Sequence, residues 1–141
     1  WDASSGRPMH SLRHRGRIRC LQASPCGKKV LVASGSTLSL WSGVAGTLNL
    51  EIPVPFFQAW DDTIRVSRGG ARIFAAVRSD IYVWDGLTGD VLRRMSMEHD
   101  VHNFAIDAEG RRIFAFSQSL DNVSDAVWDI GLTDPLRLLP G

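Results

Sequence analysis

The sequence predicts an all-β fold in which about three copies of one unit follow each other, each copy a sheet of four short antiparallel strands. Four tryptophans recur at intervals of 40, 43 and 44 residues: Trp1, Trp41, Trp84 and Trp128. Three glycines each precede a short apolar run by three residues: Gly27, Gly70 and Gly110. No segment keeps a helical period over a useful length. These three observations together indicate a repeated β-sheet rather than a mixed fold.

Turn residues bound the strands of each copy. The expected strands of the first copy are 18–23, 29–34, 37–42 and 47–51. Those of the second are 62–67, 71–77, 80–85 and 91–95, and those of the third are 102–107, 111–117, 124–129 and 135–139. The third copy carries about four extra residues between its second and third strands. We expect residues 8–13 to be the last strand of a preceding unit.

The middle strands of each copy are apolar on consecutive residues, which is typical of sheets covered on both faces. A single four-stranded sheet cannot hide two apolar faces, whereas stacked sheets cover one another. Four strands in about 40–45 residues is the size of a β-propeller blade. The sequence therefore predicts about three blades of an incomplete ring, all in one repeat domain. The expected bounds are 1–13 for the end of an upstream blade, then 14–54, 55–96 and 97–141 for blades 1 to 3.

Two further positions recur in register with the tryptophans. Three of the four are followed by an aspartate: Asp2, Asp85 and Asp129. Three have a glycine five residues on: Gly6, Gly46 and Gly89. With the strand register, these positions make the chain resemble the WD-repeat β-propeller family over nearly its whole length. The resemblance implies structural roles for Trp41, Trp84, Asp85, Trp128 and Asp129.

The resemblance also implies a capping histidine before the first strand of a blade. His14 and His99 stand at that place, although neither follows the glycine of the family pattern, and the middle blade has no such histidine. The family's turn aspartate is replaced by Gly35 and Arg78 in the first two blades. The buried hydrogen-bond network of the family is thus expected to be incomplete, so a tryptophan N–H needs another acceptor.

Composition and charge narrow the class of protein. The chain has 141 residues, 44% of them apolar, which suffices for a core and argues against disorder. Its formal charge is +1, but residues 1–29 carry seven basic side chains and one acidic one. No apolar run approaches the length needed to cross a bilayer, and no signal peptide is apparent. Because the chain begins at Trp1, we expect a piece of a larger protein or a processed product.

The two cysteines, Cys20 and Cys26, are too few for a disulfide framework. Two idle thiols suit a reducing compartment, which predicts a cytoplasmic or nuclear location. Cys26 lies in a turn, where an exposed thiol is expected, but the sequence does not show whether that thiol is reactive.

The most distinctive polar segment contains four alternating arginines: Arg13, Arg15, Arg17 and Arg19. On an extended segment they would point to one side. Such a basic patch suits acidic or phosphorylated peptides, which arginine binds bidentately. Nucleic acid is disfavoured because no aromatic residue is interleaved to stack bases. The alternative is a solvated loop that tolerates arginine.

The sequence offers no catalytic set, cofactor-binding motif or metal-ligand spacing. His14 and His99 fall in different blades without a matching carboxylate or cysteine pattern. We therefore expect no cofactor and a non-enzymatic scaffold for a protein or peptide partner. The missing blades would come from a parent chain or from self-association that closes the ring. The alternatives are a segment of a propeller enzyme whose site lies partly outside this chain, and a phosphate- or nucleic-acid-binding surface formed by Arg13–Arg19.

Overall fold

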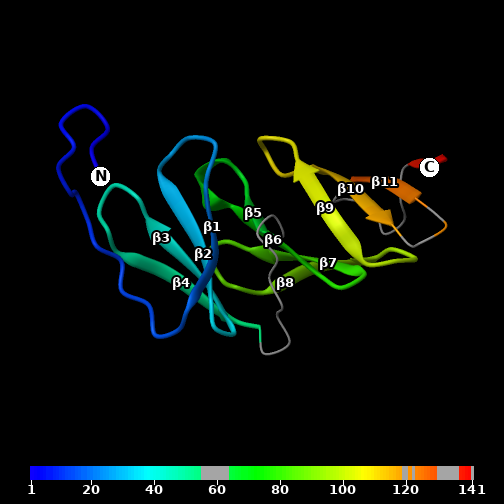
Figure 1. Ribbon diagram of the computed structural model, residues 1–141, viewed down its shortest axis with the longest axis horizontal. Helices are drawn as coiled ribbons and strands as arrows, with labels where there is room; N and C mark the ends of the chain where they lie inside the picture. The colour runs from blue at the N-terminus through cyan, green and yellow to red at the C-terminus, as the bar shows by residue number, and fades with distance from the viewer. Residues whose placement is uncertain (55–63, 119–120, 122, 130–136, 141) are drawn as a thin grey trace.

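The computed structural model describes residues 1–54, 64–118, 121, 123–129 and 137–140. These residues form three antiparallel sheets of four strands each, and the sheets follow one another along the chain (Figure 1). In every sheet the strand order is the sequence order, with neighbours joined as hairpins. The expected all-β architecture of three repeated sheets, with no closed ring, is confirmed.

The strand bounds lie within two residues of those expected wherever both ends are described. The first sheet contains β1 (Ile18–Ala23), β2 (Lys29–Ser34), β3 (Thr37–Ser42) and β4 (Leu48–Pro53). The second contains β5 (Ile64–Val66), β6 (Arg72–Val77), β7 (Asp80–Asp85) and β8 (Val91–Ser96), with a short 3-10 turn, η1 (Arg68–Gly70), after β5. The third contains β9 (Val101–Ile106), β10 (Arg112–Gln118), β11 (Val123–Asp129) and β12 (Arg137–Pro140).

Two-residue turns join the second and third strands of the first two sheets. Gly35 and Arg78 are the first turn residues, with φ of 55° and 57°. This left-handed backbone matches the twist of the flanking strands, and glycine adopts it more readily than arginine. In the third sheet the second and third strands are each one residue longer, and four residues instead of two separate them in the sequence, which accounts for the four extra residues of that copy.

The recurrent Trp-Asp and glycine spacing builds the turn between the third and fourth strands. The Asp85 carboxylate accepts hydrogen bonds from the backbone N–H groups of Leu87 (2.8 Å) and Thr88 (3.0 Å). The N–H of Gly89 donates to the Asp85 carbonyl at 2.9 Å, and Gly89 has φ of 78°. The spacing recurs because this turn needs a side-chain acceptor at its first residue and a residue with positive φ at its last.

Adjacent sheets enclose two apolar cores. The first joins side chains of the first sheet to Ile73, Ala75, Val77 and Trp84 of the second. The other joins Phe74, Ala76, Ile81 and Val83 of the second sheet to Ile113, Ala115, Ala126 and Trp128 of the third. Alternate residues of β6 thus enter different cores, which explains why this strand is apolar on consecutive residues.

Residues 8–13 do not form the expected strand. A strand requires a neighbour in a hydrogen-bonded ladder, and none of the described sheets includes these residues. Their contact is with the turn between β3 and β4, where His10 Nε2 lies 2.7 Å from the Val44 carbonyl oxygen. The expected boundaries at residues 55 and 141 lie outside the described residues.

Candidate functional site

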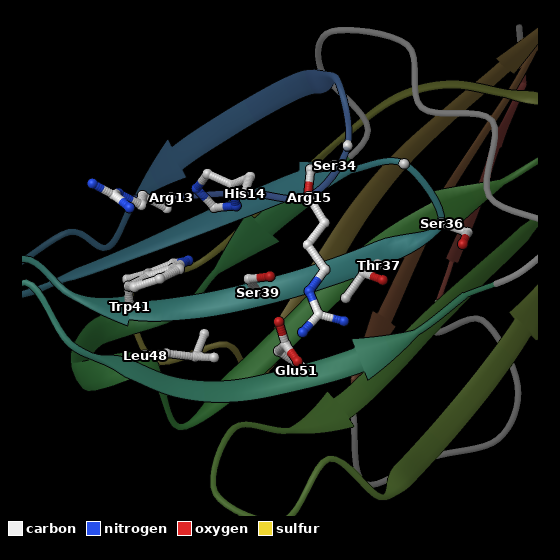
Figure 2. A pocket seen from close by; sticks show the side chains of 12 residues that line it. Arg13, His14, Arg15, Ser34, Ser36, Thr37, Ser39, Trp41, Leu48 and Glu51 are labelled. Carbon is white, nitrogen blue, oxygen red and sulfur yellow. The ribbon is translucent and has the colours of Figure 1, made fainter. Parts of the chain in front are cut away.

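A pocket of about 400 Å³ opens on the face of the first sheet that points away from the second (Figure 2). The strand period sets this face, because Leu38 and Leu40 enter the core while Thr37, Ser39 and Trp41 point to the other side. The pocket is lined by Arg13, His14, Arg15, Gly16, Ser34, Gly35, Ser36, Thr37, Ser39, Trp41, Leu48 and Glu51.

The segment before β1 forms the rim of this pocket because two glycines let it approach the β2–β3 turn. A Cβ atom on Gly16 would lie 3.0 Å from the backbone nitrogen of Gly35. The N–H of Gly35 donates to the carbonyl of Arg17 at 3.1 Å. Residues 15 and 16 bend at this contact, which turns the chain into β1.

The four arginines do not form the single row that an extended segment predicts. Arg13 and Arg15 line the pocket, whereas Arg17 and Arg19 do not. The bend at residues 15 and 16 and an irregularity in β1 between Ile18 and Cys20 both break the alternation. Arg13 lies at the Trp41 end of the pocket, and the Arg15 side chain points across it toward Glu51 (Figure 2). Among the described residues, no ion pair within 4.0 Å involves the guanidinium group of Arg13 or Arg15.

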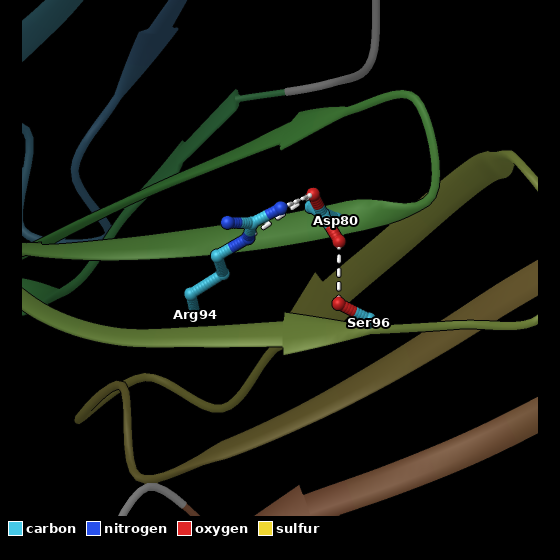
Figure 3. A network of polar contacts seen from close by, with 3 residues as sticks. All are labelled: Asp80, Arg94 and Ser96. Atoms are coloured by element: carbon cyan, nitrogen blue, oxygen red, sulfur yellow. Dashed lines mark hydrogen bonds and ion pairs between the residues drawn. The ribbon is translucent and has the colours of Figure 1, made fainter.

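In the second sheet, side chains of β7 and β8 occupy the place that corresponds to the pocket of the first sheet (Figure 3). By strand pairing, Tyr82 occupies the position of Ser39, and Arg94 the position of Glu51. Arg94 donates to Asp80 at 2.6 and 3.1 Å and lies over the Tyr82 ring, 5.5 Å from its centroid. The small Ser39 therefore leaves a space in the first sheet that an aromatic ring and an ion pair occupy in the second.

Trp41 lines one end of the pocket, beside His14 (Figure 2). The two rings meet edge to face, with centroids 5.3 Å apart and planes at 69°. The indole Nε1 of Trp41 is buried and has no hydrogen-bond partner among the described residues. This agrees with the expectation that the polar network around the repeat tryptophan is incomplete in this blade.

The other repeat positions differ from Trp41 in their surroundings. Trp84 and Trp128 are buried between sheets, in the first and second core respectively. His99 Nε2 and Ser117 Oγ are both buried without a hydrogen-bond partner in the described part of the chain. The histidines His14 and His99 belong to different blades and do not meet in one site. Asp85 closes its turn as described above, and Asp129 ends β11.

The thiol of Cys26 lies outside the pocket, in the turn between β1 and β2. The Ser24 hydroxyl, 3.4 Å from Sγ, is the largest influence that lowers the pKa of Cys26 to about 7. The backbone N–H groups of Lys28 and Gly69 act in the same direction. Cys20 is buried in the first core, and neither cysteine is in a disulfide.

Within the described ranges, no three of the side chains of His, Cys, Asp and Glu gather as a metal site would require. No helix of that part of the chain is long and apolar enough to cross a membrane. The pocket brings two guanidinium groups, several hydroxyls and an indole around one hollow, and these groups can form hydrogen bonds, ion pairs and apolar contacts with a ligand.

Sequence reasoning missed the part of this pocket that the second to fourth strands supply, which includes Ser34, Thr37, Ser39 and Glu51. Aligning the repeats could have indicated Ser39, because it is a small side chain where the second copy has Tyr82. Glu51 comes from β4 and reaches the pocket only through the pairing of β3 with β4.

No protein-family model matches the chain, and no curated protein matches it. Solved structures do. The chain is similar to the crystal structure of the RRP9 WD40 repeats, at 19% identity and a TM-score of 0.69, covering 92% of this chain and 40% of that one. It is equally similar to the structure of U3-55K, at 19% identity and a TM-score of 0.69, covering 92% and 41%.

A third similar structure is the computationally designed Ika4 protein, at 18% identity and a TM-score of 0.70, covering 96% of this chain and 81% of that one. The chain thus spans about 40% of the length of the two WD40 structures it matches. At these identities the likeness concerns the fold, which agrees with the repeat spacing and the sheet order. The chain therefore has the fold of a WD-repeat β-propeller, of which it forms three consecutive blades.

Proposed function

We propose that the chain is a non-enzymatic protein-interaction scaffold and that the pocket on its first blade binds an acidic or phosphorylated segment of a protein partner. The observation that carries this proposal is the pair of guanidinium groups, Arg13 and Arg15, on the rim of a preformed hollow. Arginine binds carboxylate and phosphate in a planar, two-pronged geometry that also fixes orientation.

The rest of the lining supports an anionic ligand with an apolar body. Hydroxyl groups of Ser34, Thr37 and Ser39 can donate to ligand oxygens, and Trp41 with Leu48 supplies apolar surface. Glu51 is the single acid of the lining and favours a ligand that also brings a donor group. A peptide segment carries both kinds of group, because its backbone N–H groups accompany the anionic side chain.

Two other functions are less well supported. A propeller enzyme would need reactive side chains on the innermost strands, where β1, β5 and β9 carry none as a matched set. A nucleic-acid surface would need a continuous basic stripe, whereas Arg17 and Arg19 lie away from the pocket that Arg13 and Arg15 line.

The exposed free thiol of Cys26 supports a reducing, intracellular compartment for this scaffold, cytoplasmic or nuclear. An exposed thiol is readily oxidised or paired with other thiols outside the cell.

Calorimetric titration tests the proposed function with three peptides of one sequence: a phosphoserine form, an aspartate form and a serine form. We expect binding in the order phosphoserine, aspartate, serine, and a loss of at least about tenfold in Arg15→Ala, because one charged contact contributes about 1.5–3 kcal/mol. Arg17→Ala is the matched control, since it removes the same charge outside the pocket. Ser39→Tyr should abolish binding by filling the hollow as Tyr82 does in the second blade. Equal affinity for all three peptides, or equal losses in Arg15→Ala and Arg17→Ala, would contradict the proposal.

A further inference from the structure

We call the face of a sheet that points toward the N-terminal neighbour its leading face, and the opposite face its trailing face. The second sheet packs on the first by its leading face and on the third by its trailing face. At the first junction, the trailing-face residues are Leu31, Ala33, Leu38 and Leu40, packed on the leading face of the second sheet. At the second junction they are Phe74, Ala76, Ile81 and Val83, packed on the leading face of the third. The same pattern of residues thus joins consecutive blades twice.

The trailing face of the third blade repeats this pattern and is covered by no described residue. Through the pairing of β10 with β11, Phe114 and Val127 match Leu31 and Leu40, and Phe116 matches Ala33. Leu31 and Ala33 are fully buried, whereas Phe114 is 46% exposed. Two large aromatic side chains therefore lie on a face that is buried at both junctions inside the chain.

One residue of this face departs from the apolar pattern. Asp125 pairs with Phe116 as Leu38 pairs with Ala33 and as Ile81 pairs with Ala76. Leu38 and Ile81 are fully buried against the following blade. A carboxylate at this position can be covered only by a surface that supplies donors or cations, because burying an unpartnered charge is costly.

The leading face of the first blade also departs from the apolar pattern, with polar groups that can pair with a carboxylate. Its counterpart positions in the second blade carry the buried Val77 and the large Tyr82, whereas the first blade carries Ser34 and Ser39. Arg13 and Arg15 add two cations at its rim. Asp125 lies near the end of its sheet where β10 leads into β11, and Ser34 and Arg15 lie at the corresponding end of the first sheet, whereas Arg13 lies at the other end of the pocket beside Trp41 (Figure 2).

We propose that a second copy of this chain occupies the trailing face of the third blade, with Asp125 of each copy in the arginine-lined pocket of the other. This inference rests on the proposed function, because it names the acidic partner of that same pocket. Two copies related by a twofold axis would form two identical junctions and close a ring of six blades. Six lies within the range of four to eight blades that propellers typically have.

The test is the mass of the chain in solution by light scattering over a range of concentrations, with circular dichroism to verify folding. The wild type is expected to have twice the mass of the chain. Asp125→Arg and Arg15→Asp should each weaken the dimer by roughly 30-fold or more, because each reverses one charge of a covered pair and places like charges together at both junctions. The double variant should regain the dimer, because the exchanged charges attract again. Asp90→Arg, on the exposed β7–β8 turn, is the matched control and should leave the mass unchanged.

A folded monomer of the wild type would overturn the inference, and so would a dimer that Asp125→Arg does not weaken or irregular aggregates that no charge exchange affects. Peptide titration separates this result from the proposed function. If the wild type is a monomer that binds the phosphopeptide, the dimer is wrong and the pocket assignment stands. If the Asp125→Arg variant is a monomer with an open pocket that binds no peptide, the dimer stands and peptide recognition is wrong.

Discussion

Replacing Trp84 with alanine tests whether the repeat tryptophan holds the blades together. Trp84 is 4% exposed, sits in the core between the first and second sheets, and stacks on Tyr82 with ring centroids 5.6 Å apart. Burial of an aromatic side chain removes about 150–250 Å² from water, which corresponds to about 4–6 kcal/mol at about 25 cal/mol per Å². Measured truncations of buried aromatic residues cost about 3–5 kcal/mol. We therefore expect Trp84→Ala to lower the free energy of unfolding by about 4 kcal/mol.

Urea denaturation followed by far-ultraviolet circular dichroism gives this free energy. Two tryptophans serve as controls. Trp41→Ala should cost clearly less than Trp84→Ala, because Trp41 is half-buried and lies on a face that no other described sheet covers. Trp1→Ala should cost less than about 0.5 kcal/mol, because Trp1 is 84% exposed. A loss below about 1 kcal/mol for Trp84→Ala, or equal losses at all three positions, would refute packing between blades.

Three further predictions follow from particular contacts. Gly86→Ala should destabilise by at least about 2 kcal/mol in the same urea assay, because the added Cβ would overlap the Gly70 carbonyl oxygen; a neutral substitution would contradict this close approach. Alkylation of Cys26 should rise with pH through a midpoint near 7, and Ser24→Ala should move that midpoint upward; an unchanged midpoint would exclude the hydroxyl as the cause. Two backbone N–H groups lower the pKa of Asp85 below its usual 3.8, so its stabilising effect is present at neutral pH and is lost as the pH falls through that lowered pKa. Asp85→Asn should therefore make unfolding less acid-dependent below about pH 4 in acid titrations followed by circular dichroism, and an unaltered acid profile would oppose this assignment.

The strands could be predicted because their determinants are local. Gly27 and Gly110 have φ of 71° and 67°, so the glycine that marks the repeat also builds the turn before the second strand. The consecutive apolar residues that follow enter two different cores, which is what made the stacking of sheets predictable. Residues 8–13 were the exception, because a strand depends on a partner that local pattern does not reveal.

The site could be predicted only in part, because it depends on contacts between distant segments. Arg13 and Arg15 were identifiable only as members of one row of four arginines, because their separation from Arg17 and Arg19 depends on the close approach of Gly16 to the β2–β3 turn. Asp125 was missed for a related reason. The longer β10–β11 hairpin shifts the third copy against the other two, so its equivalence to Leu38 appears only in the strand pairing.

The outer faces of the first and third blades are expected to carry the interactions of this chain. The most direct measurement is the light-scattering mass of the wild type beside the Asp125→Arg variant at equal concentration. We expect twice the chain mass for the wild type and the single-chain mass for the folded variant. Equal masses for the two proteins would contradict this expectation.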